Sequence, residues 1–368
     1  MKQKRILHLI PAPFGADGIF GGAERYALEL AKTMARWLPT RLVSFGSQSR
    51  RTFDVGGLEE IVLGNAWSVR GQTTNPYHSG IFRHIWWADV VHCHQNHTLG
   101  AEIAAIFSRL TQKKVYASDL GGGGWGLNGY MKTDGLFTGH LHISEYSRKY
   151  AGHAHINRAA VIYGGVDTSR FFPDISVRKE PLVVFVGRVM PHKGIDNLIR
   201  ALPDGLSLEV IGRPYNSEYQ ALLTKLAFGK EVRFRSDCDD DEVVKAYRRA
   251  ICVALPSLYR DCYGNETRIP ELLGQTLLEG MACGVAGLCT QVASLPEVVE
   301  DGVSGYVVPP NDTDALGERL RILRDYPNLV AQMGLAARHR VLTTFTWDIV
   351  VDRCFAAYGV TRTPPSAS

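Results

Sequence analysis

Short apolar runs alternate with longer amphipathic segments along most of the chain, and Gly, Pro, Asp or Asn residues separate them. Runs such as Arg5–Ile10 (RILHLI) and Leu182–Val186 (LVVFV) are almost wholly apolar, which is typical of parallel strands that are buried on both faces. Segments such as Gly100–Leu110 place small and apolar side chains at helical spacing. Repeated strand–helix alternation predicts an α/β protein with doubly wound parallel sheets.

Two such series occur, and a weakly periodic stretch bearing Gly and Pro separates them. We therefore expect two Rossmann-like doubly wound domains that face each other across a cleft, because ligands bind at the carboxyl ends of such strands. The expected division is an N-terminal domain at 1–165, a linker at 166–181, a C-terminal domain at 182–345, a closing helix at 346–360 that packs back on the N-terminal domain, and a disordered tail at 361–368.

Composition narrows the class of protein. The chain is 45% hydrophobic and 21% charged, which is ordinary for a globular protein. Its seven cysteines form no CxxC pair, and several lie in apolar runs, so we expect a reducing, cytoplasmic compartment rather than a disulfide frame or a zinc ribbon. No apolar run reaches membrane-spanning length, and the opening MKQKRILHLIPAP is interpreted as a first strand rather than a signal peptide.

Charge is unevenly distributed. Residues 1–165 hold 18 Lys and Arg against 11 Asp and Glu, a net charge of +7, whereas the remainder carries −3. A basic first half favours an anionic acceptor or peripheral contact with the inner face of a membrane, but a solvated basic face explains it equally simply. Without a dense Lys/Arg block, no nucleic-acid partner is expected.

The stretch Pro270–Gly284 (PELLGQTLLEGMACG) contains two carboxylates, Glu271 and Glu279, eight positions apart. We expect a helix that begins near Gly274 or Gln275 and ends at Gly284 in a left-handed cap. The first amides of a helix have no partner inside it, so they can bind a ligand oxygen. Alternatively, the pair reflects only the preference for Glu near a helix start.

Two cations flank the turn that follows the strand Leu182–Val186. Arg188 comes directly after this strand and Lys193 opens the next helix, expected over Lys193–Leu202. A guanidinium fork and an ammonium on one strand-to-helix turn can converge on a diphosphate. Alone, the pattern is also explained by surface cations that cap a turn.

Four segments together carry a family resemblance. They read FVGRVMPHKGIDNLIRAL, PSLYRD, PELLGQTLLEGMACGVAGLCT and LPEVVEDGVSGYVVPPND, and they cover roughly Val183 to Asp312. In this order and spacing they resemble the second domain of the retaining family-four glycosyltransferases with the GT-B fold, which carry a Glu-x7-Glu motif at the donor site. The first half resembles the family less tightly, through GGAE, DVVHCH and VIYGGVD…FFP.

The resemblance implies a role for each matching residue. Arg188 and Lys193 would bind the diphosphate of a nucleotide sugar, Glu279 the ribose, and Glu271 the transferred sugar. The backbone at Gly22 would approach the phosphate or sugar, and the base would contact groups around Arg213 and 234–236. The implied donor set is Gly21, Gly22, Arg188, Lys193, Arg213, Glu271, Leu273, Gly274, Gln275, Thr276 and Glu279. Arg188, Lys193 and Glu271 would be catalytic.

The acceptor side is less defined. Many relatives carry a histidine where Leu120 stands here. The neighbouring Asp119 is the remaining catalytic candidate: it either orients the acceptor hydroxyl or contacts the donor sugar, or it merely caps the glycine loop at 121–126. Trp125 would stack on a sugar, or belong to a simple turn. The run 92–97 (HCHQNH) suggests acceptor lining, packing or a metal site, and we expect no metal because Arg188 and Lys193 supply the positive charge. The acceptor-side candidates are His94, His97, Asp119, Gly122 and Trp125.

The sequence thus predicts a metal-independent, retaining hexosyltransferase that needs no cofactor. Its substrate would be a nucleoside-diphosphate sugar, with UDP ranked before GDP, and its acceptor a glycan, a lipid-linked sugar or a small molecule. A sugar-nucleotide epimerase of the same fold and a non-catalytic sugar-nucleotide-binding module are the alternatives. NAD is not expected, because the Gly21-Gly22 turn lacks the GxGxxG pattern.

Overall fold

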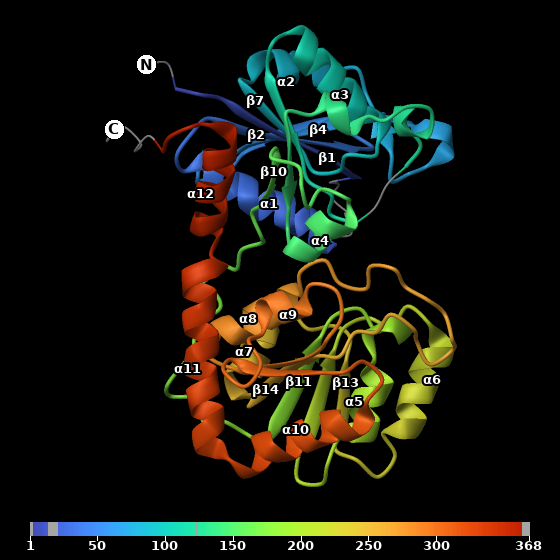
Figure 1. Cartoon of the computed structure of the whole chain (residues 1–368), viewed down its shortest axis with the longest axis vertical. Helices are drawn as coiled ribbons and strands as arrows, with labels where there is room; N and C mark the ends of the chain where they lie inside the picture. Colours follow the sequence, from blue (N-terminus) through green and yellow to red (C-terminus); the bar gives the residue numbers. More distant parts are fainter. Residues whose placement is uncertain (1–2, 14–20, 122–123, 363–368) are drawn as a thin grey trace. The chain divides into compact units, whose positions relative to one another are not determined.

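The computed structural model describes residues 3–13, 21–121 and 124–362 of the chain (Figure 1). The chain divides into two compact units. Unit 1 comprises Met1–Gly165 and Trp347–Ser368, and unit 2 comprises Val166–Thr346. Each unit contains one large sheet of its own and is described by itself below.

The sheet of unit 1 has eight strands in the order β10-β9-β8-β7-β1-β2-β4-β3. All neighbours pair in parallel except the edge strand β3, which runs antiparallel to β4. The strands are β1 (Ile6–Pro13), β2 (Thr40–Gly46), β3 (Arg50–Phe53), β4 (Glu59–Gly64), β7 (Val90–Cys93), β8 (Lys114–Ala117), β9 (Gly139–His142) and β10 (Ala159–Val161), and a separate pair is formed by β5 (Trp67–Ser68) and β6 (Pro76–Tyr77).

The helices of unit 1 are α1 (Gly22–Ala35), α2 (Ile81–Trp87), α3 (Leu99–Leu110), α4 (Glu145–Tyr150) and α12 (Trp347–Tyr358), with 3-10 turns η1 (Val69–Gly71), η2 (Leu127–Gly129) and η3 (Asp134–Leu136). The chain returns to this unit through α12, which Figure 1 draws in red beside α1 in blue. Lys114 Nζ donates to the carbonyl of Tyr358 at 2.7 Å, and the Tyr116 hydroxyl donates to that of Ala357 at 2.8 Å. These bonds satisfy carbonyls that a helix end leaves open and fix α12 to β8.

The sheet of unit 2 has six parallel strands in the order β13-β12-β11-β14-β15-β16. They are β11 (Leu182–Val186), β12 (Ser207–Ile211), β13 (Val232–Arg235), β14 (Cys252–Leu255), β15 (Ala286–Thr290) and β16 (Gly305–Val308). The connecting helices are α5 (Ile195–Ala201), α6 (Ser217–Leu226), α7 (Asp240–Arg249), α8 (Gln275–Ala282), α9 (Leu295–Val298), α10 (Thr313–Asp325) and α11 (Pro327–Thr344), with a 3-10 turn η4 (Pro191–Lys193). The strand order reverses between β11 and β14, which defines the topological switch point of a Rossmann-like sheet.

The segment 166–181, expected to be a linker, lies within unit 2. The amide of Val166 donates to Phe345 at 2.8 Å, Arg170 forms an ion pair with Asp240 at 2.7 Å, and the amide of Glu180 donates to Arg249 at 2.8 Å. Side chains of this segment, which was expected to be a linker because it is weakly periodic and bears Gly and Pro, therefore pair with α7.

Other elements differ from the sequence expectation. Strand β1 continues to Pro13, beyond the apolar run that ends at Ile10, although Pro11 and Pro13 lack an N–H donor. It pairs with β2 and β7 up to Leu9, and after a shift in register Pro13 lies opposite Phe45 of β2. The helix predicted from Lys193 begins at Ile195, because a 3-10 turn precedes it. The loop residues 14–20, Gly122 and the tail residues 363–368 lie outside the described residues.

The expectation of two α/β units with Rossmann-like parallel sheets is confirmed. All seven cysteines are free, and five of them are buried. Among the helices in the part of the chain that the structure describes, none has the length and apolar character needed to cross a membrane.

Candidate functional site

The switch point of unit 2 collects the residues that the sequence predicted for the donor. Arg188 and Lys193 follow β11, and Ser257 and Glu271 follow the neighbouring strand β14. The two connections touch directly, since the amide of Leu258 donates to the carbonyl of His192 at 2.8 Å. Residues 78 positions apart are thus brought to one edge of the sheet.

Lys193 and Glu271 form an ion pair through Nζ and Oε1, and their side chains are only 10% and 12% exposed. The Ser257 hydroxyl donates to the same Oε1 at 2.8 Å, and the Ser257 carbonyl accepts from the Thr290 hydroxyl at 2.5 Å. Lys193 Nζ also lies 3.4 Å from the carbonyl of Pro270. The sequence assigned these two charges to different parts of a ligand, and the structure shows that they are also partners of each other.

Glycines make this close packing possible. Gly194 has φ +65°, and a Cβ atom there would lie 2.1 Å from the carbonyl oxygen of Pro256. A Cβ on Gly212 would lie 1.8 Å from the carbonyl oxygen of Gly187. Any larger residue would push apart the loops after β11, β12 and β14, so these glycines position Arg188 and Lys193.

Arg188 and Arg213 carry the exposed positive charge of this edge. They follow the paired strands β11 and β12, and the amide of Val189 donates to the carbonyl of Arg213 at 3.0 Å. Their guanidinium groups have no hydrogen-bond or ion-pair partner within residues 3–13, 21–121 and 124–362. They therefore remain available to an anion, whereas Lys193 is already paired with Glu271.

Helix α8 contributes the second carboxylate. The helix begins at Gln275 after Gly274, which has φ +86°, and it ends at Cys283 and Gly284, with φ +72° at Gly284, as the sequence predicted. Glu279 is buried, and the Tyr247 hydroxyl lies 3.4 Å from its Oε2. Of the first-turn residues, Gln275 and Thr276 are half-buried, whereas Leu273 before them is buried.

Sequence reasoning missed the supports of this site. Ser257 belongs to the PSLYRD segment directly after a buried strand, and that position was the available signal. Thr290 and Tyr247 gave no signal, because their contacts are 33 and 32 positions away in the chain. The long connection at 258–269 is an ordered turn, in which Asp261 accepts from the amides of Tyr263 and Asn265 at 2.9 and 3.0 Å.

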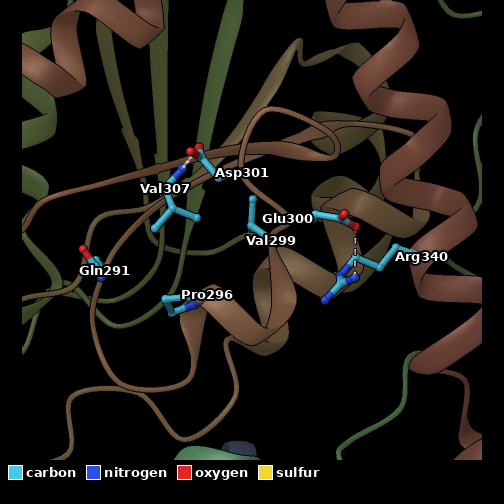
Figure 2. A pocket seen from close by; sticks show the side chains of 7 residues that line it. All are labelled: Gln291, Pro296, Val299, Glu300, Asp301, Val307 and Arg340. Atoms are coloured by element: carbon cyan, nitrogen blue, oxygen red, sulfur yellow. Dashed lines mark hydrogen bonds and ion pairs between the residues drawn. The ribbon is translucent and has the colours of Figure 1, made fainter.

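Unit 2 also contains a cavity of about 480 Å³, shown in Figure 2. Its wall includes an ion pair between Glu300 and Arg340 at 3.3 Å, and Asp301 accepts from the amide of Val307 at 2.9 Å. The remaining lining residues are Gln291, Pro296 and Val299. None of the predicted donor residues lines this cavity.

In unit 1, Gly21 and Gly22 stand at the start of α1, and a Cβ on Gly22 would meet no atom of the described residues within 4 Å. Asp119 accepts from the amide of Gly121 at 3.0 Å and from Gln95 Nε2 at 3.3 Å, the contacts of a residue that caps the glycine loop. Its role toward an acceptor stays a prediction. Trp125 is fixed by its backbone, which bonds Gln72 and Asn75, and Arg70 lies 4.3 Å above its ring.

The predicted histidines lie at the carboxyl end of β7 in unit 1. His94 is buried and its Nε2 is 2.8 Å from His8 Nδ1, while His92 bonds Ser118 and Tyr358 at 2.8 and 2.7 Å. Burial lowers the pKa of His8 to about 3 and holds the pKa values of His92 and His94 well below 6.5. Half-buried His97 lies beyond them, and its Nδ1 has no partner within the described ranges.

Two groups of side chains in the described part of unit 1 have the spacing to hold a metal ion, although none was expected. One is His8, His92 and His94, and the other is Asp134, His140 and His153. Neither group includes a residue of unit 2, so neither involves Arg188 or Lys193.

Comparison with known proteins identifies relatives of this arrangement. The family model described as "Glycosyl transferases group 1" matches residues 167–340. A GDP-mannose-dependent alpha-(1-6)-phosphatidylinositol monomannoside mannosyltransferase of Mycolicibacterium smegmatis is 33% identical over 224 residues, covering 56% of this chain and 58% of that protein. A D-inositol 3-phosphate glycosyltransferase of Streptomyces bingchenggensis is 28% identical over 215 residues, covering 51% and 45%. The chain therefore spans about half the length of the curated relatives it matches.

Solved structures resemble the whole chain. Sucrose-phosphate synthase of Thermosynechococcus elongatus superposes with a TM-score of 0.73 at 18% identity, covering 97% of this chain and 98% of that chain. HepE of Anabaena, in complex with UDP and glucose, gives a TM-score of 0.70 at 16% identity, covering 97% and 99%. At such identities the likeness shows the fold, which is the GT-B fold of two Rossmann-like domains.

Proposed function

We propose that this chain is a retaining glycosyltransferase that moves a sugar from a nucleoside-diphosphate sugar to a hydroxyl group of an acceptor. One observation carries the proposal. The buried Lys193–Glu271 pair lies at the switch point of unit 2, beside Arg188 and Arg213, whose guanidinium groups have no partner in the part of the chain that the structure describes. This edge combines uncompensated positive charge, which suits a diphosphate, with an oriented carboxylate, which suits a sugar.

The positive charges would serve the leaving group. When the sugar–phosphate bond breaks, negative charge grows on the diphosphate, and fixed cations stabilise it. A lysine ammonium has three N–H donors. Lys193 directs one to Glu271 and another toward the carbonyl of Pro270, which leaves the third for a phosphate oxygen. Arg188 and Arg213 would add planar forks that suit phosphate oxygens.

The carboxylates would hold the sugar and the ribose. Both contacts of Glu271, from Lys193 and Ser257, use Oε1, so Oε2 is the oxygen that the transferred sugar would meet. The negative charge there would also favour the positive charge that develops on the ring. Glu279, buried on α8 about two turns further along, would accept hydrogen bonds from the ribose hydroxyls. The departing phosphate can take the acceptor proton, so this reaction needs no strong protein base.

The relatives' names revise the order in which donors should be tried. A relative of 33% identity is named as GDP-mannose-dependent, which supports GDP before UDP, the reverse of the order favoured by the sequence alone. The acceptors in the relatives' names are an inositol phosphate and a mannosylated phosphatidylinositol. Both are anionic polyols, and the net charge of +7 over residues 1–165 suits such an acceptor. We therefore propose an anionic polyol, free or on a lipid, as the acceptor class.

Thermal unfolding with GDP, UDP, ADP and dTDP tests the donor site. A ligand that binds only the folded chain at 100 times its Kd stabilises it by about 2.7 kcal/mol. We expect GDP to raise the melting temperature most, and Arg188→Ala to reduce this shift. Arg233→Ala, which removes an exposed arginine on β13 of the same unit, should keep it. A melt that no nucleotide shifts would contradict the proposal.

Product analysis separates the transferase from an epimerase. We expect free nucleoside diphosphate to appear from GDP-mannose only when an acceptor is present, and the new linkage to keep the donor's anomeric configuration in the NMR spectrum. Conversion of the nucleotide sugar into an isomer without acceptor would identify the epimerase instead. Turnover that survives chelation of divalent cations would support the expected metal independence.

A further inference from the structure

Four side chains on one side of unit 1 lie together outside all the residues discussed for donor and acceptor. His140 and His142 are two apart on β9 and therefore share a face of the sheet. Asp134 opens η3 just before this strand, and His153 lies in the turn after α4, which is labelled in Figure 1. The ring centroids of His140 and His153 are 4.3 Å apart.

The distances between the side chains of this group are close to those between the ligands of one metal ion. His153 Nε2 lies 3.8 Å from Asp134 Oδ2, which is too far for a hydrogen bond. Two ligands of one tetrahedral zinc ion, at bonds of about 2.0–2.1 Å, stand about 3.3 Å apart, so a small shift of the half-exposed Asp134 side chain would suffice. One ligand atom each from Asp134, His140 and His153 already lie within 4.8 Å of one another.

His142 supplies the support that such sites usually have. Its Nε2 is 3.0 Å from His153 Nδ1. If His153 Nδ1 carries the proton and donates it to His142, the lone pair of His153 stands on Nε2, which faces the carboxylate. Metal-binding histidines typically use their second nitrogen in this way.

The charge state of the group also suits a cation. His140, His142 and His153 are buried, and Asp134 supplies a carboxylate that would partly compensate the charge of a bound ion. Two cations are near the group. Arg148 forms an ion pair with Glu145 at 2.7 Å, and Arg158 is close to His140. The Asp134 side chain is 43% exposed, which gives an ion a route from solvent.

The other histidine group contrasts with this one. His8, His92 and His94 are fully buried, include no carboxylate, and bond one another, Ser118 and Tyr358. A divalent cation there would bring uncompensated charge into the core, and such burial is costly. We therefore interpret that group as packing.

We propose that Asp134, His140 and His153 bind a divalent cation of the zinc class (Zn²⁺, Co²⁺ or Ni²⁺), with a water as the fourth ligand and His142 orienting His153. The ion would join η3, β9 and the turn after α4, which are separate in the chain. Because this site is built from strand β9 and its flanking turns, its role is to fix these elements rather than to take part in sugar transfer.

Metal binding by the full-length, chelator-stripped protein tests the proposal. Titration with Co²⁺, followed by its visible absorption, and competition with a chromogenic chelator for Zn²⁺ report affinity without any activity assay. We expect wild type to bind about one ion and to melt at a higher temperature in its presence. Saturable binding should persist in His155→Ala, which removes an exposed histidine two positions from His153.

Variants of the proposed ligands test whether the ion binds at Asp134, His140 and His153. Asp134→Asn keeps the shape of a half-exposed side chain and should weaken binding by roughly tenfold or more, and His153→Ala should abolish it. If His153→Ala unfolds the protein, as circular dichroism of the metal-free form would show, Asp134→Asn alone decides. Wild-type affinity in Asp134→Asn, no saturable binding by wild type, or loss of binding in His8→Ala but not in His153→Ala would each overturn the proposal.

Discussion

The carboxyl edges of the two sheets share a topology and differ in chemistry. In unit 2 the strands on either side of the switch point, β11 and β14, lead to Arg188 and the Lys193–Glu271 pair, and the neighbouring strand β12 leads to Arg213. In unit 1 the equivalent strands, β1 and β7, lead to His8, His92 and His94, all of which are buried. The switch point thus determines where polar side chains gather, and burial determines whether they carry charge.

This difference has a physical cause. A charge remains near a sheet edge when it is exposed, as in Arg188, or paired, as in Lys193 with Glu271. A histidine has a third option, because it can lose its proton and be buried as a neutral ring. Unit 2 therefore has a charged edge, whereas the equivalent part of unit 1 has neutral, buried rings that bond one another and nearby groups, and the predictions below test this contrast.

The largest effect is expected from the charged edge. Lys193→Ala removes the ammonium that would stabilise the leaving diphosphate and leaves Glu271 without its ion-pair partner. Loss of one such preorganised donor typically lowers kcat by about 10²–10³. Steady-state transfer kinetics would measure this, and Lys225→Ala, an exposed lysine on α6, is the control. If Lys193→Ala turned over at the wild-type rate, Lys193 would not stabilise the leaving diphosphate. The charged edge of unit 2 would then lack the catalytic role that distinguishes it from unit 1.

Acidification should act first on unit 1. The pKa values of buried His8, His92 and His94 lie below 6.5 in the folded chain because of burial, so the unfolded chain binds more protons below pH 6.5. Their contribution to stability is complete above pH 6.5 and is lost as the pH falls toward the folded pKa, about 3 for His8. Between pH 6.5 and 5.5 the loss from His8 would be about 1 kcal/mol, and His92 and His94 would add losses of the same sign.

Hydrogen exchange followed by mass spectrometry reports protection for each unit separately. Protection in unit 1 should fall more steeply between pH 7.5 and pH 5.5 than in unit 2, where, among the described residues, His192 is the histidine whose pKa is lowered, to about 4. An equal loss in both units would contradict the assigned burial of the histidine group.

Two glycines offer a matched comparison of steric constraint. Gly194→Ala in unit 2 forces a Cβ to within 2.1 Å of a carbonyl oxygen at φ +65°, so we expect a loss of roughly 2–3 kcal/mol in unfolding free energy. Gly22→Ala in unit 1 meets no atom within 4 Å in the described part of the chain and should change stability by less than about 0.5 kcal/mol.

The informative result is the activity of Gly22→Ala. If the Gly22 backbone approaches the donor as the family resemblance implies, this stable variant should show a raised KM for the nucleotide sugar. Chemical denaturation and donor titration of the same preparations measure both quantities. Unchanged donor KM in Gly22→Ala would remove that residue from the donor set.

The buried carboxylate of α8 should give a smaller effect. Glu279→Gln keeps the shape of the side chain but loses the charge that would hold the ribose hydroxyls, and a hydrogen bond to a charged group is worth about 1.5–3 kcal/mol. We expect about a tenfold or greater weakening of nucleotide binding by calorimetry, with Glu318→Gln on α10 as the exposed control. If the two variants bound the nucleotide with equal affinity, Glu279 would not be the residue that binds the ribose.

Long apolar runs made much of the fold predictable. Strand β11 has the expected bounds, and α12 lies within the closing helix expected at 346–360, because continuous apolar or amphipathic patterns define them. Strand β3 was missed because all four of its residues are exposed, and α4 because its start depends on a Ser144–Ser147 capping box that has no apolar signature. Local patterns therefore predict buried elements better than exposed ones.

The candidate site shows the same limit. Its residues are near strand ends, so their positions could be inferred, but the Lys193–Glu271 contact spans 78 positions and depends on how β11 and β14 pair. Likewise, Glu102 of α3 accepts from the amides of Leu127 and Asn128 and thereby holds the loop that bears Trp125, although nothing local marks it. Such contacts come from tertiary packing, which a single sequence does not reveal.

The smallest effect is expected at Trp125. Its backbone amide donates to Gln72 Oε1 at 2.7 Å and its carbonyl accepts from Asn75 Nδ2 at 2.6 Å, so the loop is anchored without the indole ring. Trp125→Ala should therefore leave the melting temperature nearly unchanged. If the ring stacks on the acceptor, the acceptor KM should rise by roughly three- to tenfold, the equivalent of about 0.5–1.5 kcal/mol, while donor binding stays constant.

Trp86→Ala removes a tryptophan of α2 that is 66% exposed and serves as the control, and Trp125→Phe should recover part of the acceptor affinity. An acceptor KM that is the same in wild type and Trp125→Ala would leave Arg70, 4.3 Å from the ring, as the partner that explains the residue. In that case unit 1 would recognise its acceptor through hydrogen-bonding groups alone, and the contrast with the charged edge of unit 2 would be sharper still.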